Sequence, residues 1–189
     1  MKRFNLSLVI FLLLSISCDK KIPDYAQIKL DDFSGKQNLI TSLNGTLMVY
    51  VFISPECPLS ENYTLTLSKL QEELKEKDVE FYYVFPGTFY PRPQIEQFVK
   101  VYGLPERSIY YDPLYQLRDY CAATITPEAF VFDQLGKIHY RGAIDNWAIT
   151  LGKQRQVISE HYLYDAISQL NEGQKVKIEK TRAVGCIIE

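Results

Sequence analysis

The sequence has 189 residues, of which 47% are hydrophobic and 23% are charged, a balance typical of one folded globular domain. The formal net charge of −2 provides no basic field of the kind that nucleic-acid binding requires. Two histidines are too few for a histidine-rich metal site, and nothing in the sequence implies a bound metal or organic cofactor. The composition therefore argues against a nucleic-acid-binding protein and indicates a compact domain.

The N-terminal segment has the pattern of a targeting signal. Lys2 and Arg3 precede the apolar run Leu6–Ile16, which is too short to span a bilayer as a mature helix. Small residues then lead to Cys18, and the segment resembles a bacterial lipoprotein signal in which residues 1–17 are removed and Cys18 carries the lipid. Ordinary cleaved secretion and a retained anchor are the alternatives. All three alternatives predict a domain outside the cytoplasm, where disulfides persist. The lipoprotein signal also predicts lipid anchoring to a bacterial membrane.

The folded part of the chain follows a short polar lead-in. Residues 18–27 are predicted to form a tether, and residues 28–189 one domain. Ile28 and Leu30 alternate with polar neighbours, which predicts a short edge strand. Residues 46–54 are β-branched or aromatic over most of their length, which is typical of a central strand with two buried faces.

A cysteine follows this strand and begins the clearest helix. Apolar side chains recur at steps of three and four and predict a single helical stripe: Leu59, Tyr63, Leu67, Leu70 and Leu74. Pro58 suits the first helical position, where its missing N–H is not needed. Backbone N–H groups and the helix dipole at this end favour the thiolate, which is the reactive form of cysteine. Cys57 is therefore predicted to be a redox nucleophile, with a buried inert cysteine as the alternative.

Strand and helix patterns alternate along the rest of the chain. They predict a strand at 79–85, a helix at 94–102, a strand at 108–111, a helix at 114–121, and a hairpin of 128–133 with 137–141. An irregular polar loop is expected over 142–157, followed by a helix over 159–170 with Ser159 as its N-cap. This order predicts an α/β fold of three layers, with a central mixed sheet and helices on both faces.

Two motifs in this order resemble the thioredoxin fold. Ser-Pro-Glu-Cys57-Pro stands at the first strand-to-helix turn, and Thr126-Pro127 stands before the hairpin. More closely, the chain resembles the redoxins, which include peroxiredoxins and membrane-tethered periplasmic thiol–disulfide proteins. The resemblance implies a cis peptide bond before Pro127, with Thr126 and Pro127 lying against Cys57 and shaping a substrate groove.

The chain departs from the motifs of both groups of redoxins. A dithiol thioredoxin has Cys-x-x-Cys, whereas here Ser60 stands at the second cysteine position. Ser54 matches the Thr or Ser that a peroxiredoxin places three residues before its cysteine, but Tyr50 stands where the peroxiredoxin proline would be. Any thiol that resolves an oxidised Cys57 must therefore come from outside this motif.

Two later cysteines are candidates for that role. Cys121 lies in a predicted short helix and is either a packed core residue or a resolving thiol. Cys186 lies in a Gly-Cys-Ile segment of the tail and is a candidate partner for Cys57 or for Cys121. Spacing along the sequence does not fix which pair forms a disulfide, so both pairings stay open.

Polar residues near these motifs are candidates for the surroundings of the thiol. Ser54, Ser60 and the first N–H groups of the helix could bind a thiolate or sulfenate, or could serve only as a helix cap. Arg141 follows a strand and could hold a peroxide or another anionic group, or could be a solvated arginine at the end of a strand.

The residues and the resemblance together predict a lipid-anchored thiol oxidoreductase. Cys57 would attack a disulfide or a peroxide, and the expected partners are a protein thiol or disulfide, or the peroxide itself. A redox-inactive binding module of the same fold is the first alternative. A copper-handling redoxin is the second, although its Cys-x-x-x-Cys motif would need a cysteine where Glu61 stands.

Overall fold

The computed structural model describes residues 24–40 and 46–188. The expected signal peptide, residues 1–17, and the expected lipid site at Cys18 lie outside the described residues, as does most of the expected tether, residues 18–27. Within the described ranges, no helix has the length and the apolar character needed to cross a membrane.

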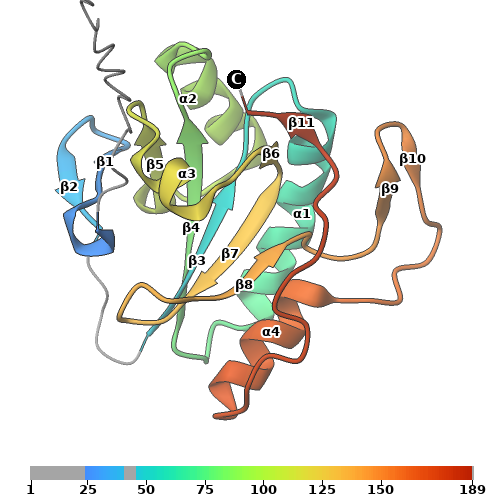
Figure 1. Cartoon of the computed structure of the whole chain (residues 1–189). Coiled ribbons are helices and arrows are strands. Elements are labelled where there is room, and N and C mark those ends of the chain that lie inside the picture. The colour runs from blue at the N-terminus through green and yellow to red at the C-terminus, as the bar shows by residue number, and fades with distance from the viewer. Residues whose placement is uncertain (1–23, 41–45, 189) are drawn as a thin grey trace, which may run out of the picture.

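A mixed β-sheet of seven strands forms the centre of the domain (Figure 1). Its strands are β1 (Lys29–Asp32), β2 (Gln37–Leu39), β3 (Leu47–Phe52), β4 (Val79–Pro86), β5 (Ile109–Asp112), β7 (Glu128–Phe132) and β8 (Ile138–Gly142). They lie in the order β2-β1-β5-β4-β3-β7-β8. β3, β4 and β5 are parallel, whereas the outer pairs are antiparallel. The predicted mixed sheet, with its closing hairpin β7–β8, is thus confirmed.

Helices cover both faces of the sheet, as the sequence predicts. They are α1 (Pro58–Glu73), α2 (Arg92–Tyr102), α3 (Gln116–Cys121) and α4 (Tyr162–Asn171), with 3₁₀ turns η1 (Tyr25–Gln27) and η2 (Glu106–Ser108). Side chains of α1, α2 and α4 pack in one hydrophobic cluster, and those of α3 and η1 in a second. Because alternate side chains of a strand point to opposite faces, Val49 and Val51 of β3 join the first cluster, and Tyr50 and Phe52 the second.

Two predictions about the strands were wrong. Ile28 and Leu30 do not mark the edge of the sheet, because β1 lies between β2 and β5. The edge strand β2 has three residues with no alternating apolar pattern, so its sequence does not predict it. The loop over 142–157 is not wholly irregular, since it contains a small hairpin of β9 (Ala148–Thr150) and β10 (Lys153–Gln154).

The start of the last helix also differs from the prediction. α4 begins at Tyr162, and its N-cap is His161 rather than Ser159. The Asn146 side chain binds Ser159 instead, because its amide donates to the Ser159 hydroxyl at 2.9 Å and its carbonyl accepts from the Ser159 N–H at 3.1 Å. The hydroxyl that was expected to cap the helix therefore fixes the preceding loop.

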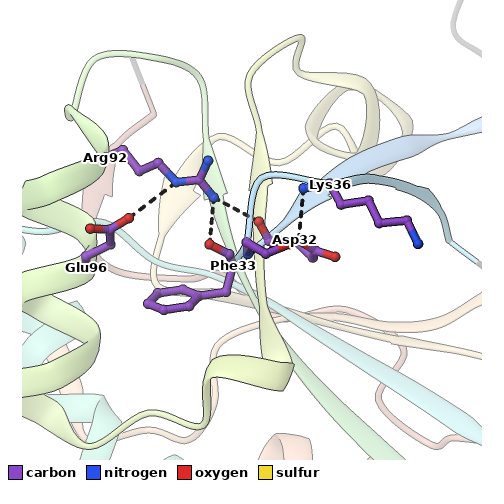
Figure 2. Close-up of polar contacts among 6 residues, drawn as sticks. Asp32, Phe33, Lys36, Arg92 and Glu96 are labelled. Carbon is purple, nitrogen blue, oxygen red and sulfur yellow. Dashed lines mark hydrogen bonds and ion pairs between the residues drawn. The ribbon is translucent and has the colours of Figure 1, made fainter.

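One arginine joins the β1–β2 turn to α2 (Figure 2). The Arg92 guanidinium donates to the carbonyl oxygens of Asp32 and Phe33, at 3.0 and 2.8 Å. It also pairs with Glu96 at 3.4 Å and lies 4.4 Å from the centre of the Tyr111 ring. The first turn of α2 is thereby attached to the β1–β2 turn by a residue that also begins the helix.

The C-terminal segment crosses the domain as an extended strap, a name we use for residues 179–188 (Figure 1). The strap first follows β8, where the Arg141 N–H donates to the Glu179 carbonyl at 3.0 Å and the Thr181 N–H donates to the Arg141 carbonyl at 3.0 Å. It then forms β11 (Cys186–Ile187), which pairs antiparallel with β6 (Ile125–Thr126). This pairing carries the end of the chain to the turn where α1 begins.

Candidate functional site

The first thiol of the candidate site lies where the sequence predicts it. Cys57 follows β3 and is the N-cap residue of α1, with Pro58 in the first helical turn. The Cys57 side chain is 1% exposed, and its thiol donates to the carbonyl oxygen of Thr126 at 3.1 Å. The peptide bond between Thr126 and Pro127 is cis, as the resemblance to the thioredoxin fold implied. The structure therefore brings Cys57, Pro58 and the Thr126-Pro127 turn together.

A second thiol meets the first from the strap. The pairing of β11 with β6 places Cys186 directly opposite Thr126, the residue whose carbonyl oxygen accepts from Cys57. The thiols of Cys57 and Cys186 are hydrogen-bonded to each other, and both cysteines are free. The sequence leaves two partners open for Cys186, namely Cys57 and Cys121. The fold brings Cys186 to Cys57.

The two thiols have opposite tendencies to ionise. Burial raises the pKa of Cys57, but the Cys186 thiol, the Ser60 hydroxyl and the backbone N–H groups of the same two residues donate to its sulfur, and the net effect lowers the pKa below its ordinary value. Burial, together with the hydrogen bond to Cys57 and the charge of Cys57, raises the pKa of Cys186 to about 12. The first negative charge therefore resides on Cys57, while Cys186 keeps its proton.

Two serines near the thiols have different tasks. The Ser60 hydroxyl donates to Cys57 and accepts from the backbone N–H of Ser54 at 3.3 Å, so it contacts the reactive sulfur directly. The Ser54 hydroxyl instead pairs with the Thr126 hydroxyl at 2.8 Å. Ser54 thus fixes the segment before Pro127, and Ser60 supplies a hydrogen bond at the place of the second cysteine of a Cys-x-x-Cys motif.

Two candidate residues are not brought to the thiol pair. Cys121 is buried in the hydrophobic cluster of α3, whereas Cys57 belongs to the cluster on the other face of the sheet. Burial raises the pKa of Cys121 well above its ordinary range. Arg141 lies over Phe130, which is on the Cys121 side, where it donates to the Ala122 carbonyl at 3.3 Å. Its ion pair is with Glu128, at 3.8 Å.

Tyr90 is a neighbour of the thiols that the sequence analysis missed. It follows β4, and its hydroxyl is hydrogen-bonded to Ser54. Burial and the nearby charges of Glu56, Cys186 and Cys57 raise its pKa. The available signal was topological, because side chains after the carboxyl ends of adjacent parallel strands meet at one edge of the sheet.

The strap is held on both sides of Cys186. On one side, the Thr181 hydroxyl pairs with the Tyr140 hydroxyl at 2.6 Å and accepts from the Ala143 N–H at 2.9 Å. On the other side, the Ile188 N–H donates to the Thr124 carbonyl at 2.9 Å, and the Ile188 side chain is buried. Gly185 is required between these anchors, because a β-carbon there would collide with the Thr126 carbonyl oxygen.

No family model matches the sequence, and no curated protein is significantly similar to it. Similar solved structures include a hypothetical protein from Sinorhizobium meliloti 1021, with a TM-score of 0.71 at 19% identity over 87% of this chain and 91% of that one. An uncharacterized conserved protein from Geobacillus kaustophilus has a TM-score of 0.70 at 23% identity over 90% of each chain. A third is a secreted disulfide oxidoreductase of Mycobacterium tuberculosis, homologous to DsbE of E. coli. Its TM-score is 0.51 at 19% identity, over 60% of this chain and 81% of that one.

The fold is thioredoxin-like. The order of the strands, the cysteine at the N-terminus of α1 and the likeness to the mycobacterial oxidoreductase and to a thioredoxin-like protein from Aeropyrum pernix agree on this point. At these identities the likeness establishes the fold alone.

Proposed function

We propose that the protein is an extracytoplasmic thiol oxidoreductase in which Cys57 is the redox nucleophile and Cys186 is its resolving partner. The observation that carries the proposal is the juxtaposition of the two thiols, one at a helix N-terminus beside the Thr126 carbonyl and the other on the strap directly opposite Thr126. The lowered pKa of Cys57 supports its role, because the thiolate is the attacking species.

The chemistry passes two electrons from the thiols to an oxidant. The Cys57 thiolate attacks one sulfur of a disulfide and releases the other half as a thiolate. Alternatively, it attacks the terminal oxygen of a peroxide and releases, after protonation, water from hydrogen peroxide or an alcohol from an alkyl hydroperoxide. Cys57 then carries a mixed disulfide or a sulfenic acid. Cys186 gives up its proton, its sulfur attacks the Cys57 sulfur, and a thiol or water departs. One disulfide between Cys57 and Cys186 remains.

Oxidation of cysteine variants tests this function. Exposure of the mature protein to diamide or hydrogen peroxide is expected to give a single Cys57–Cys186 bridge, which peptide mass mapping under non-reducing conditions detects. Cys57→Ser and Cys186→Ser remove the bridge, and Cys57→Ser abolishes turnover with either oxidant. Cys121→Ser is the matched control, because its thiol lies on the other face of the sheet. Unchanged turnover in Cys57→Ser contradicts the proposal.

Burial of the nucleophile is the observation that favours a second function. A thiol that is 1% exposed can belong to a redox-inactive binding module. Slow alkylation of Cys57 together with no bridge after oxidant treatment would support that function.

For the copper-handling alternative, no group of three or more His, Cys, Asp or Glu side chains suited to a metal occurs among the described residues.

The cellular location is part of the same proposal. The lipoprotein-like pattern of residues 1–17 and the secreted status of the mycobacterial protein of similar fold support a location outside the cytoplasm. Labelling with a fatty acid in a bacterial host is expected to modify the protein and not its Cys18→Ser variant. Equal labelling of both would remove the lipid anchor from the proposal.

A further inference from the structure

The two sulfurs of the pair differ in their access to solvent. Cys57 is 1% exposed and belongs to the hydrophobic cluster beneath α1. Cys186 is partly exposed, and its neighbour Ile187 is among the most exposed apolar residues described, at 76%. A molecule that approaches the pair from solvent therefore meets the strap and the sulfur of Cys186 first.

The geometry of thiol–disulfide exchange makes this difference decisive. An attacking thiolate approaches one sulfur along the axis of the S–S bond, from the side opposite the sulfur that leaves. For attack on Cys186, the leaving sulfur is the inner one, and the approach comes from outside the domain. For attack on Cys57, the approach would have to come from the side of Cys57 that faces away from Cys186, and Cys57 is 1% exposed and belongs to the hydrophobic cluster.

We propose that external thiols reduce the oxidised protein by attack on the sulfur of Cys186, so that Cys186, and not Cys57, carries the mixed disulfide with the electron donor. The inference rests on the proposed Cys57–Cys186 couple. It reverses the simple expectation that the cysteine at the helix N-terminus also exchanges with the partner during reduction.

The steps balance in electrons and protons. A donor thiolate, RS⁻, forms a bond to the Cys186 sulfur while the S–S bond breaks, and Cys57 leaves as a thiolate. A second donor thiolate, R′S⁻, then attacks the R sulfur, which forms R–S–S–R′ and releases Cys186 as a thiolate that takes up a proton. Two donor thiols are oxidised to a disulfide, and the protein disulfide is reduced to two thiols. A disulfide or a peroxide, acting as the oxidant, then restores the bridge.

Two features of the site support this direction of cleavage. The thiolate with the lower pKa is the better leaving group, and hydrogen bonds from Ser60 hold the charge on Cys57. The anchors at Thr181 and Ile188 hold the strap on both sides of Cys186. Cys186 can therefore carry a bound partner while the departed Cys57 thiolate stays beside it.

Trapping of the mixed disulfide tests the proposal. The mature protein with Cys121→Ser is oxidised by diamide, checked for its bridge, and treated briefly with glutathione before acid quenching and labelling of free thiols with N-ethylmaleimide. Mass mapping is expected to find glutathione on Cys186 and the label on Cys57, in at least about tenfold excess over the reverse arrangement. A majority of glutathione on Cys57 overturns the proposal. Absence of the bridge before glutathione is added contradicts the underlying couple instead.

A second measurement does not depend on trapping an intermediate. In a Cys121→Ser background, glutathione is attached to the remaining described thiol of Cys57→Ser and of Cys186→Ser, under denaturing conditions followed by refolding, and its release by dithiothreitol is timed. Release from Cys186 is expected to be at least about tenfold faster than release from Cys57 in the folded protein. In denaturant the two rates should become similar. Equal rates in the folded state contradict the proposed entry of thiols at Cys186.

Discussion

Ser60 occupies the position at which a Cys-x-x-Cys motif has its second sulfur. Its hydroxyl donates to Cys57, and the same oxygen accepts from the Ser54 N–H. A hydrogen bond to a charged group contributes about 1.5–3 kcal/mol, so this one hydroxyl can move the ionisation of the thiol by about one pKa unit or more. Ser60 therefore supplies a hydrogen bond to Cys57 at this position, while the proposed mechanism assigns the redox role of the second cysteine to Cys186.

Ser60→Ala is expected to raise the pKa of Cys57 by about one unit, because the thiolate loses a donor and the neutral thiol loses little. Thiolate absorbance near 240 nm or alkylation rate as a function of pH measures the shift. Ser54→Ala is the matched control, since the Ser54 hydroxyl pairs with Thr126 and not with the sulfur. An equal shift in both variants would contradict a direct role of the Ser60 hydroxyl.

At this scale, the sequence predicts the residues that lie close together along the chain. Cys57, Pro58 and Ser60 share one strand-to-helix turn, and local patterns are sufficient to place them there. The partner of Cys57 depends on the register between β11 and β6, two strands of two residues each, for which no periodic pattern exists. Tyr90 was missed because no motif marks the segment that carries it.

Among the elements, the short helix α3 depends on one buried carboxylate. Asp112 ends β5, and its oxygens accept from the N–H groups of Gln116 and Arg118 at 2.7 and 2.9 Å. It thereby caps a helix whose own N-cap residue, Tyr115, makes no side-chain cap. Burial outweighs these hydrogen bonds and raises the pKa of Asp112 to about 6.

The raised pKa makes the stability of the fold dependent on pH. Below pH 4 Asp112 is protonated in both states, whereas between about 4 and 6 the folded state holds the proton more tightly than the unfolded state. The free energy of unfolding should therefore fall as pH rises through this window, and the contribution lost by pH 7 is about 3 kcal/mol. Acidification from pH 7 to pH 5 is expected to stabilise this part of the fold.

Asp112→Asn should flatten this dependence, because an amide does not ionise. Urea unfolding at several pH values between 4 and 7 measures the difference between the variant and the wild-type protein. Asp78→Asn, at an exposed carboxylate in the turn after α1, is the control for loss of one charge. A pH profile of Asp112→Asn parallel to that of the wild-type protein would contradict the assignment.

The elements that the sequence predicts well are those with long amphipathic or apolar patterns. α1, β3 and β4 bury several side chains each, and their patterns are set by these contacts. β2 and the β9–β10 hairpin have no buried side chains, and they form through backbone pairing with the neighbouring strand. Their positions follow from tertiary structure and not from their own residues.

At the scale of the whole molecule, the proposed bridge would join α1 to the strap and close a loop of about 130 residues. Such a loop removes conformational freedom from the unfolded chain, which corresponds to about 4–5 kcal/mol when the folded state accepts the bridge without rearrangement. Both cysteines already lie at Thr126 in the reduced fold, so we expect the bridge to form without a change of topology.

The oxidised protein is therefore expected to melt about 10 °C above the reduced protein. Calorimetry with and without reductant measures the difference, and Cys186→Ser should abolish it while Cys121→Ser retains it. A lower melting temperature in the oxidised form would show that the bridge strains the fold.

The central sheet has a consequence for how this bridge is made. Three described cysteines allow three different intramolecular bridges, and unguided oxidation would sample all of them. The sheet separates Cys121 from the other two sulfurs, so of these three bridges the folded domain favours the proposed one between Cys57 and Cys186. Errors in pairing are thereby confined to the time before the sheet forms. After that, the protein could pass through many rounds of oxidation and reduction without an isomerase to correct it.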